Sequence, residues 1–504
     1  MHLVLRFALA LWLSSPALVA QQDEIVSDFQ KAFPRFKERP ERIEAVRTLD
    51  SATSPGVIDV LAGLFKDRDP EVARAAEEVL GAIKTPEVRA AVRARIPDEK
   101  DARTLAGLVK SLGAAKDAEG APLARAQLAH KDLEVRLAAV RTVALLRDKE
   151  AQPLLLALLA EKDNALRISA LDALGDLADP AAGSAIAGVL ADPDWQVKAA
   201  AVAAARKVRA KEPIGPLVAL LRDEGRIAAD AMQALVAITG DSYDRAELWE
   251  RWWERTGERY VVPTAAELKA RAEAMKASRA RYGPVREDGT QYHGIETPSK
   301  RILFIIDVSG SMDELIIDRA AFEGRGYKNY TKMEIAKGEL SRTLEGLGPN
   351  VRFNILAFAA EVIPWKKGLV QANVVNRSNA LKWVERLQPI GGTSAQALSS
   401  ALGGGDLEKG RTNTYGALTA GLDLAGRGTQ DRYYASEIDT IFFLSDGRPT
   451  AGEYVETDDI VVRICEMNRL KKLVLHTIAI GQFQKDFMRD LAERNGGVFV
   501  DLGK

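Results

Sequence analysis

The chain has 504 residues, and its 70 Lys and Arg side chains nearly balance its 71 Asp and Glu side chains, for a formal net charge of -1. That length predicts two or three domains rather than one core. The charge balance and the lack of a basic, aromatic-rich stripe argue against a nucleic-acid-binding protein. Cys465 is the only cysteine and the four histidines are scattered, so neither an intrachain disulfide nor a zinc site of Cys and His is expected.

Residues 1–20 have the pattern of a secretory signal peptide. Arg6 precedes an apolar stretch from Phe7 to Leu13, and the small residues of 17–20 come before polar Gln21. An uncleaved membrane anchor is the alternative, but the apolar stretch is short for a bilayer span. We therefore expect an exported, bacterial-type protein, periplasmic or secreted to the cell surface, with no transmembrane anchor after signal cleavage.

An internal repeat organises residues 30–242. Asp recurs at steps of 32, 31, 31 and 31 residues, and in most units apolar residues follow it at the third, seventh and eleventh positions. Positions four apart share one helical face. A second apolar helical stretch precedes each Asp, and two helices alone cannot bury their faces, so neighbouring units are predicted to stack into an all-α solenoid. The repeated residues are Asp69, Asp101, Asp132, Asp163 and Asp194.

The segments 132–136 and 194–198 carry a resemblance to short HEAT-like repeats of the bacterial type, which also occur in phycobilisome-lyase-like proteins. The resemblance implies a solenoid whose long concave surface serves as a scaffold or as a binding surface for a protein. We interpret the repeated aspartates as N-caps of helices. Ligand binding is the alternative, but one Asp per repeat does not converge on a single site.

Residues 243–299 are interpreted as a Trp-rich cap, a helix and a linker. Trp249, Trp252 and Trp253 have the spacing of one helical face, and we predict that they seal the open end of the solenoid. A platform on which a carbohydrate stacks is the alternative interpretation.

A polar helix is predicted after this cap. Thr264 and Glu267 form a capping box that begins the helix, which extends to about Tyr282, where Gly and Pro end it. The polar stretch between that helix and Lys300 is predicted to tether two domains.

From residue 300 to 504 near-continuous apolar runs alternate with helical stretches. Such runs are typical of strands buried on both faces, and the alternation predicts a parallel, doubly wound α/β sheet. The chain as a whole is therefore predicted to be multidomain, a solenoid followed by an α/β domain. The predicted strands are 302–306, 351–358, 440–444, 474–480 and 497–500, and the predicted helices are 332–344, 414–425, 460–471 and 487–494.

Oxygen-bearing side chains follow two of these predicted strands. Asp307, Ser309 and Ser311 come directly after the first strand, and Asp446 comes after the strand at 440–444. Ligands of doubly wound folds bind beyond the carboxyl ends of strands, and oxygen ligands suit Mg²⁺. The three residues after the first strand could instead cap a local turn. If the two strands are neighbours, however, both carboxylates face one crevice and the pattern favours a metal site.

The Asp-x-Ser-x-Ser motif, paired with the Ser-Asp-Gly at 445–447, resembles the von Willebrand factor type A domain and its metal-ion-dependent adhesion site. The resemblance implies that Asp307, Ser309, Ser311 and Asp446 ligate Mg²⁺, or Mn²⁺ or Ca²⁺ in its place. It also implies that an acidic side chain of a protein partner completes the coordination of the ion.

Members of that family use one further ligand, a threonine on a loop, and two segments of this chain resemble the loop. Thr412 has the better downstream match, with Asn413 next and Ala-Leu at the start of a helix. Thr393 has the better upstream match, with two glycines. We prefer Thr412 and keep Thr393 as its alternative.

The expected function is an exported, non-enzymatic module for protein interaction and adhesion. A metal-dependent hydrolase is one alternative, in which the ion activates water. The sequence contains no P-loop and no Gly-x-Ser-x-Gly elbow, which argues against two common kinds of catalytic site. A structural scaffold with a stabilising metal is the second alternative.

Overall fold

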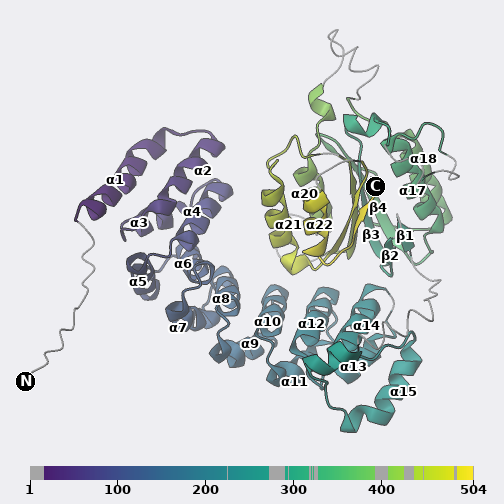
Figure 1. The fold of residues 1–504 in the computed structure, drawn as a ribbon, viewed down its shortest axis with the longest axis horizontal. Coiled ribbons are helices and arrows are strands. Elements are labelled where there is room, and N and C mark those ends of the chain that lie inside the picture. Colours follow the sequence, from purple (N-terminus) through teal and green to yellow (C-terminus); the bar gives the residue numbers. More distant parts are fainter. Residues whose placement is uncertain are drawn as a thin grey trace, which may run out of the picture. The chain divides into compact units, whose positions relative to one another are not determined.

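The residues that the computed structural model describes are 16–223, 225–271, 290–292, 295–316, 319, 322, 327–391, 407–424, 436–446, 448–481 and 485–502. The chain divides into two compact units, 1–185 and 186–504, and Figure 1 shows the fold of each.

The predicted signal peptide lies mostly outside the described residues. Helix α1 (Pro16–Ala32) begins within its last five residues, so export stays a prediction. Within the described part of the chain, no helix is both long enough and apolar enough to cross a membrane.

The first unit is an α-solenoid, as predicted. Its longer helices stack in sequence, with α2 against α4, α4 against α6, α6 against α8 and α8 against α10, while shorter helices pack beside them (Figure 1). After α1 the helices are α2 (Arg39–Arg47), α3 (Val57–Leu64), α4 (Pro70–Ala82), α5 (Pro86–Arg95), α6 (Ala102–Ala114), α7 (Ala121–Ala126), α8 (Leu133–Leu145), α9 (Gln152–Leu158), α10 (Asn164–Leu177) and α11 (Gly183–Val189), which crosses into the second unit.

The repeated aspartates cap helices, which confirms that interpretation. Each has extended backbone geometry and accepts a hydrogen bond from a main-chain N–H in the first turn of the helix that it precedes. Such a cap satisfies an N–H that has no partner within the helix, a contribution of about 1 kcal/mol each. The caps are Asp69 on α4, Asp101 on α6, Asp132 on α8, Asp163 on α10 and Asp194 on α12 (Trp195–Val208).

The second unit begins with α12, α13 (Ile214–Leu220), α14 (Arg226–Thr239) and α15 (Ala246–Thr256). Trp249 and Trp252 on α15 are buried and meet edge to face, with ring centroids 5.4 Å apart. Trp253 is partly exposed and packs close to Gly215 of α13. The prediction that these tryptophans form a sealing core is therefore confirmed for the two buried rings.

A mixed seven-stranded sheet forms the centre of the α/β domain, with the order β5-β4-β3-β7-β8-β9 and β6 beside β4. The pairs β3–β4, β3–β7, β7–β8 and β8–β9 are parallel, and β5 and β6 run antiparallel to β4. The strands are β3 (Arg301–Asp307), β4 (Arg352–Phe358), β5 (Val362–Pro364), β6 (Val370–Gln371), β7 (Thr440–Ser445), β8 (Val474–Ala479) and β9 (Phe499–Asp501).

Helices cover both faces of this sheet (Figure 1). Phe304 on β3 belongs to the core beneath α17 and α18, whereas its neighbour Ile305 belongs to the core beneath α20, α21 and α22. This alternation explains why β3 has an unbroken apolar sequence. The helices are α17 (Lys332–Gly346), α18 (Val374–Arg386), α20 (Thr414–Leu424), α21 (Thr457–Lys471) and α22 (Lys485–Glu493).

The sequence did not predict α18, β5 or β6. Only Ala380 and Val384 of α18 are buried, so its apolar periodicity is weak. The two strands are short, lie at the sheet edge and are partly exposed, so neither contains a buried apolar run.

The stretch that was predicted as a tether contains ordered structure, so that prediction is wrong for its described part. Strands β1 (Thr290–Tyr292) and β2 (Ile295–Thr297) form an antiparallel pair. Tyr292 is only 2% exposed and Ile295 4%, and the Tyr292 ring meets Phe304 edge to face at 5.4 Å. Polar neighbours in the sequence concealed these two core residues.

Helix α12 contacts the α/β domain within the second unit. The Gln196 amide donates a hydrogen bond to the Lys471 carbonyl at 3.0 Å and accepts one from the Ser436 N–H at 3.1 Å. Trp195 donates its indole N–H to the Ser436 carbonyl, and Arg301 lies over its ring, 4.6 Å from the centroid. These contacts lie at the end of α21 and just before β7, that is, at the amino end of the parallel strands.

His476 on β8 is buried under the same edge of the domain. Its Nδ1 accepts a hydrogen bond from the Val498 N–H at 3.1 Å, and its ring stacks on Phe442 with centroids 4.8 Å apart. Burial, and then the positive charge of Arg226, lower the pKa of His476 to about 4.

This lowered pKa predicts that the protein loses stability in mild acid. Between about pH 6.5 and 4 the unfolded chain binds a proton at His476 that the folded chain does not, so stability rises with pH there and falls on acidification, by at most about 3 kcal/mol. His476→Asn keeps an acceptor for the Val498 N–H but cannot titrate. Urea unfolding at pH 7.5 and pH 5 should show a smaller pH effect in this variant than in the natural chain. Equal effects in both proteins would contradict the prediction.

Candidate metal site

The two candidate carboxylates lie at the ends of neighbouring strands. Asp307 is the last residue of β3, and Asp446 comes directly after β7. The two strands pair in parallel, with Ile306 opposite Leu444. The two strands are therefore neighbours, as the sequence-based prediction of a shared site required. Because the chain places β4 on one side of β3 and β7 on the other, the two carboxylates lie where the strand order reverses.

Asp307 is fully buried, and both of its oxygens have donors. Oδ1 accepts a hydrogen bond from the Ser309 N–H at 2.8 Å, and Oδ2 accepts one from the Ser445 hydroxyl at 2.5 Å. A buried carboxylate needs such donors because water no longer solvates its charge. Ser445 is the last residue of β7, so the neighbouring strand holds the Asp307 carboxylate in place.

The two motif serines connect Asp307 to Asp446. The hydroxyls of Ser309 and Ser311 are 3.2 Å apart, within hydrogen-bonding distance, and the Ser311 hydroxyl donates to Asp446 Oδ1 at 2.9 Å. The structure therefore brings together Asp307, Ser309, Ser311 and Asp446 in one hydrogen-bonded group that crosses from β3 to β7.

Lys332, the first residue of α17, joins the same group and was missed by the sequence analysis. Its Nζ donates to Asp446 Oδ2 at 2.6 Å and to Glu314 Oε2 at 2.7 Å, and the lysine is nearly buried. One signal was available in the sequence. A positively charged side chain in the first turn of a helix interacts unfavourably with the helix dipole. A lysine at this position therefore indicates that some other interaction compensates.

Burial and neighbouring charges shift the pKa values of the charged groups at this site. Burial first, and then the charge of Asp446, raise the pKa of Asp307 to about 7. Burial also raises the pKa of Asp446, although Lys332 opposes this effect. Burial acts to lower the pKa of Lys332, but Asp446 and Glu314 outweigh it, so that pKa is raised. Two carboxylates with raised pKa values in one crevice are a place where added positive charge is favourable.

Thr412, the preferred threonine, is buried beside the segment that follows Asp446. Its N–H donates to the Thr450 hydroxyl at 2.9 Å, and its carbonyl accepts from the Thr450 N–H at 3.0 Å. Among the described residues, the hydrogen-bonded group of the two aspartates does not include the Thr412 hydroxyl. Two residues on, the buried Thr414 hydroxyl has no hydrogen-bond partner within the described part of the chain.

Thr393, the alternative, lies outside the described residues. The chain reaches it from beside the motif, since a Cβ added to Gly310 would lie 2.7 Å from the carbonyl oxygen of Gly391. Gly410 is equally close to this turn, with an added Cβ 2.6 Å from the Ile390 carbonyl oxygen. Both threonine loops therefore start next to the Asp-x-Ser-x-Ser turn. Position along the chain does not decide between them.

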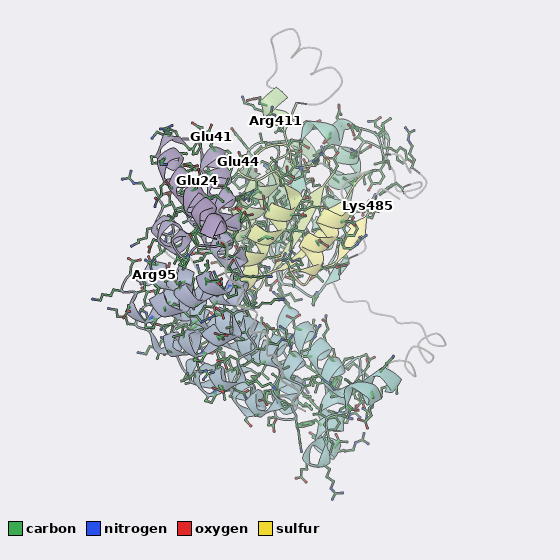
Figure 2. The ribbon with its side chains drawn as sticks, turned by 60° about the vertical axis from the view of Figure 1, so that its left-hand side comes forward. Glu24, Glu41, Glu44, Arg95, Arg411 and Lys485 are labelled. Atoms are coloured by element: carbon green, nitrogen blue, oxygen red, sulfur yellow. The ribbon has the colours of Figure 1, made fainter. Side chains whose placement is uncertain are left out.

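The edge of the site near Thr412 carries a positive side chain. Arg411 is exposed, and Figure 2 labels it at the top of the α/β domain. Its ion pair with Glu408, at 3.6 Å, is between two exposed groups and therefore weak. The side chain remains available to solvent-borne anions.

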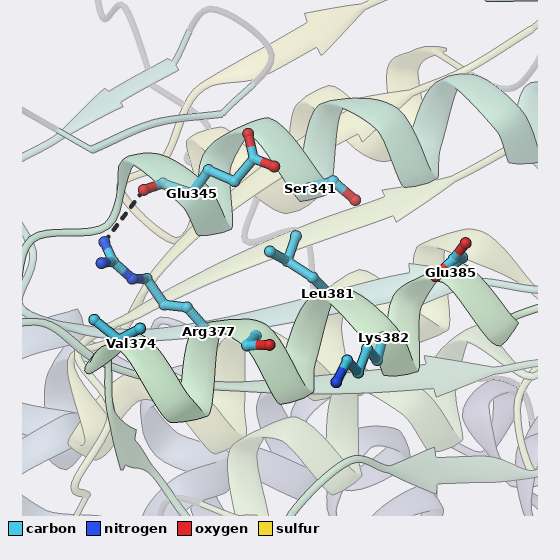
Figure 3. Close-up of a pocket in the computed structure, with 8 residues that line it drawn as sticks. Ser341, Glu345, Val374, Arg377, Leu381, Lys382 and Glu385 are labelled. Carbon is cyan, nitrogen blue, oxygen red and sulfur yellow. Dashed lines mark hydrogen bonds between the residues drawn. The ribbon is translucent and has the colours of Figure 1, made fainter.

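A separate groove lies between α17 and α18 (Figure 3). Leu381 and exposed Val374 give it some apolar surface, and Arg377 closes one end by donating to the Glu345 carbonyl at 3.2 Å. None of the candidate metal ligands lines it, so it does not form part of the metal site.

The oxygen set in the crevice suits a hard divalent cation. Mg²⁺ is commonly held by one or two carboxylates, with hydroxyls and waters completing an octahedron. Three or more His, Cys, Asp or Glu side chains do not gather as metal ligands anywhere in the described part of the chain. This site differs from such clusters because two of its four motif residues, Ser309 and Ser311, offer hydroxyls.

Comparison with known proteins identifies both halves of the chain. Residues 328–501 match the von Willebrand factor type A domain, and residues 37–113, 99–175 and 121–205 match HEAT repeats. The first match begins after Asp307, Ser309 and Ser311, so the assignment of these residues depends on their place at the end of β3.

Curated relatives match less than half of the chain. Inter alpha-trypsin inhibitor, heavy chain 4, of Mus musculus is 29% identical over 160 residues, which are 32% of this chain and 13% of that protein. Inter-alpha-trypsin inhibitor heavy chain H6 of Homo sapiens is 28% identical over 212 residues, 41% of this chain and 13% of its own. The chain therefore spans a small part of these relatives.

A search of solved structures also finds partial matches. A von Willebrand factor type A protein from Catenulispora acidiphila is 18% identical, with 41% of this chain and 39% of that chain covered and a TM-score of 0.27. The complex of CpcE and CpcF of phycocyanin lyase from Nostoc sp. PCC7120 is 15% identical, with 50% and 99% covered and a TM-score of 0.26.

The two threonines can be distinguished by removing one hydroxyl at a time. Thr412→Val keeps the side-chain shape, and we expect it to weaken Mn²⁺ binding by roughly ten-fold or more, whereas Thr393→Val should leave the affinity unchanged. Titration calorimetry on the full chain measures both. The reverse pattern would assign the ligand to Thr393.

Proposed function

Because the chain joins HEAT repeats to a von Willebrand factor type A domain, we propose that it is a protein-interaction and adhesion module that binds its partner through a divalent cation. The observation that carries this proposal is the hydrogen-bonded group that links Asp307 to Asp446 across two neighbouring strands.

Four side chains would hold the ion, namely those of Asp307, Ser309, Ser311 and Asp446, with Thr412 as the proposed fifth. The ion, Mg²⁺ or in its place Mn²⁺ or Ca²⁺, supplies a positive centre to which an anionic group can bind directly. The chain's own part is to keep both carboxylates in place, through Ser445 on one side and Lys332 on the other.

An acidic side chain is the partner group that this edge of the domain favours. The ion attracts a carboxylate, and the exposed Arg411 beside Thr412 adds positive charge near the same place. Hydroxyls and burial around Asp307 exclude much of the water that otherwise screens such an interaction.

Among the described residues, α12 contacts the α/β domain at the edge opposite the candidate ligands. Helix α12 contacts the α/β domain at the end of α21 and before β7, whereas the candidate ligands follow the opposite ends of β3 and β7. We propose that the solenoid acts as a scaffold or as a second binding surface. Export to the periplasm or cell surface is part of the same proposal and is supported by the signal-like pattern of residues 1–20.

Peptide display tests this function with a random peptide library as the probe. Peptides selected on the full chain in Mg²⁺ and eluted with EDTA should share an acidic residue, and changing that residue to its amide should abolish binding. Asp307→Ala should lose Mg²⁺ binding and peptide binding together, because it removes a buried ligand carboxylate. Asp490→Ala removes an exposed carboxylate from α22 and serves as the matched control, with no effect expected.

Two other outcomes would replace this proposal. Mg²⁺-dependent turnover in a phosphatase or peptidase screen, lost in Asp307→Ala, would indicate a hydrolase. A melting temperature that rises with Mg²⁺, with no acidic peptide recovered, would indicate a metal that only stabilises the domain.

A further inference from the structure

Lys332 places a permanent positive charge against one of the proposed ligands. Its Nζ lies 2.6 Å from Asp446 Oδ2 and 2.7 Å from Glu314 Oε2, so two carboxylates share one ammonium group. The side chain of Asp446 has no exposure to solvent in this arrangement. The ion pair is therefore screened little by water.

The surrounding backbone is built to keep Lys332 at this position. Its N–H donates to the Glu314 carbonyl at 2.9 Å, so Glu314 holds the lysine through both main chain and side chain. Gly481 lies beside it with a φ of +103°, and a Cβ there would come within 2.9 Å of Lys332 Cε. A glycine at this strained backbone position thus makes room for the lysine side chain.

We propose that Lys332 is a positioning residue that tunes the metal site by competing with the ion for Asp446. This inference rests on the proposed function, because it concerns the same cation. A divalent ion that binds Asp446 must share the negative charge of this carboxylate with the Lys332 ammonium group. The natural chain therefore binds the ion less tightly than it would without the lysine.

The same contact restricts how Asp446 can bind. Ser311 donates to its Oδ1 and Lys332 to its Oδ2, so each oxygen already has one lone pair engaged, and bidentate binding of a cation is less favourable than at an unpaired carboxylate. Ca²⁺ commonly takes bidentate carboxylates and six to eight ligands, whereas Mg²⁺ takes six ligands in a strict octahedron. Lys332 therefore disfavours Ca²⁺ relative to Mg²⁺.

Titration calorimetry of the full chain with Mg²⁺ and with Ca²⁺ tests this role. Lys332→Gln removes the charge but keeps a donor for Asp446, and we expect roughly ten-fold tighter binding of Mg²⁺ and a larger gain for Ca²⁺. Glu314→Gln should act in the opposite direction, because it leaves Lys332 paired with Asp446 alone. Structural damage cannot explain opposite signs in the two variants.

A matched control tests whether the effect is specific to this lysine. Lys382→Gln removes an exposed charge from α18 and should leave Mg²⁺ binding unchanged. If the natural chain binds neither ion, the proposed function fails and this inference fails with it. If the natural chain binds Mg²⁺ but Lys332→Gln binds it equally or more weakly, only the role of Lys332 is overturned.

Discussion

Burial of two carboxylates at the ends of adjacent parallel strands is the constraint on which the α/β domain depends. Asp307 and Asp446 lose the solvation of water, and an uncompensated buried charge costs several kcal/mol. The chain compensates with hydroxyls from Ser311 and Ser445, a main-chain N–H and the ammonium of Lys332. These donors offset the cost and leave two carboxylates close together, which is the chemical basis of the proposed cation site.

The sheet explains why these groups meet. β3 is covered on both faces, so its side chains pack into the two cores, and its polar residues are the first, Arg301, and the last, Asp307. The parallel pairing with β7 places that end beside another strand end. The opposite ends of the same strands receive α12 through Gln196 and Trp195. The contacts of α12 and the candidate metal ligands therefore lie at opposite edges of one sheet.

Elements with strong local patterns were predictable. The capping aspartates were recognisable because an N-cap is a local interaction between a side chain and the next turn. Strands β3, β7 and β8 were recognisable because burial on both faces leaves an apolar run. Helix α18 and the β1–β2 pair were missed because their few buried residues, such as Tyr292 and Val384, stand among polar neighbours. Periodicity cannot reveal an element in which only one or two residues are buried.

The sequence alone determined the repeat period, the order of solenoid and α/β domain, and the two acidic ligand candidates, Asp307 and Asp446. Each of these depends on residues close together in the chain. The tertiary structure decided which partners complete the site. Ser445 reaches Asp307 across 138 positions, and Lys332 reaches Asp446 across 114. Contacts over such separations follow from strand order and helix packing, and no local propensity encodes them.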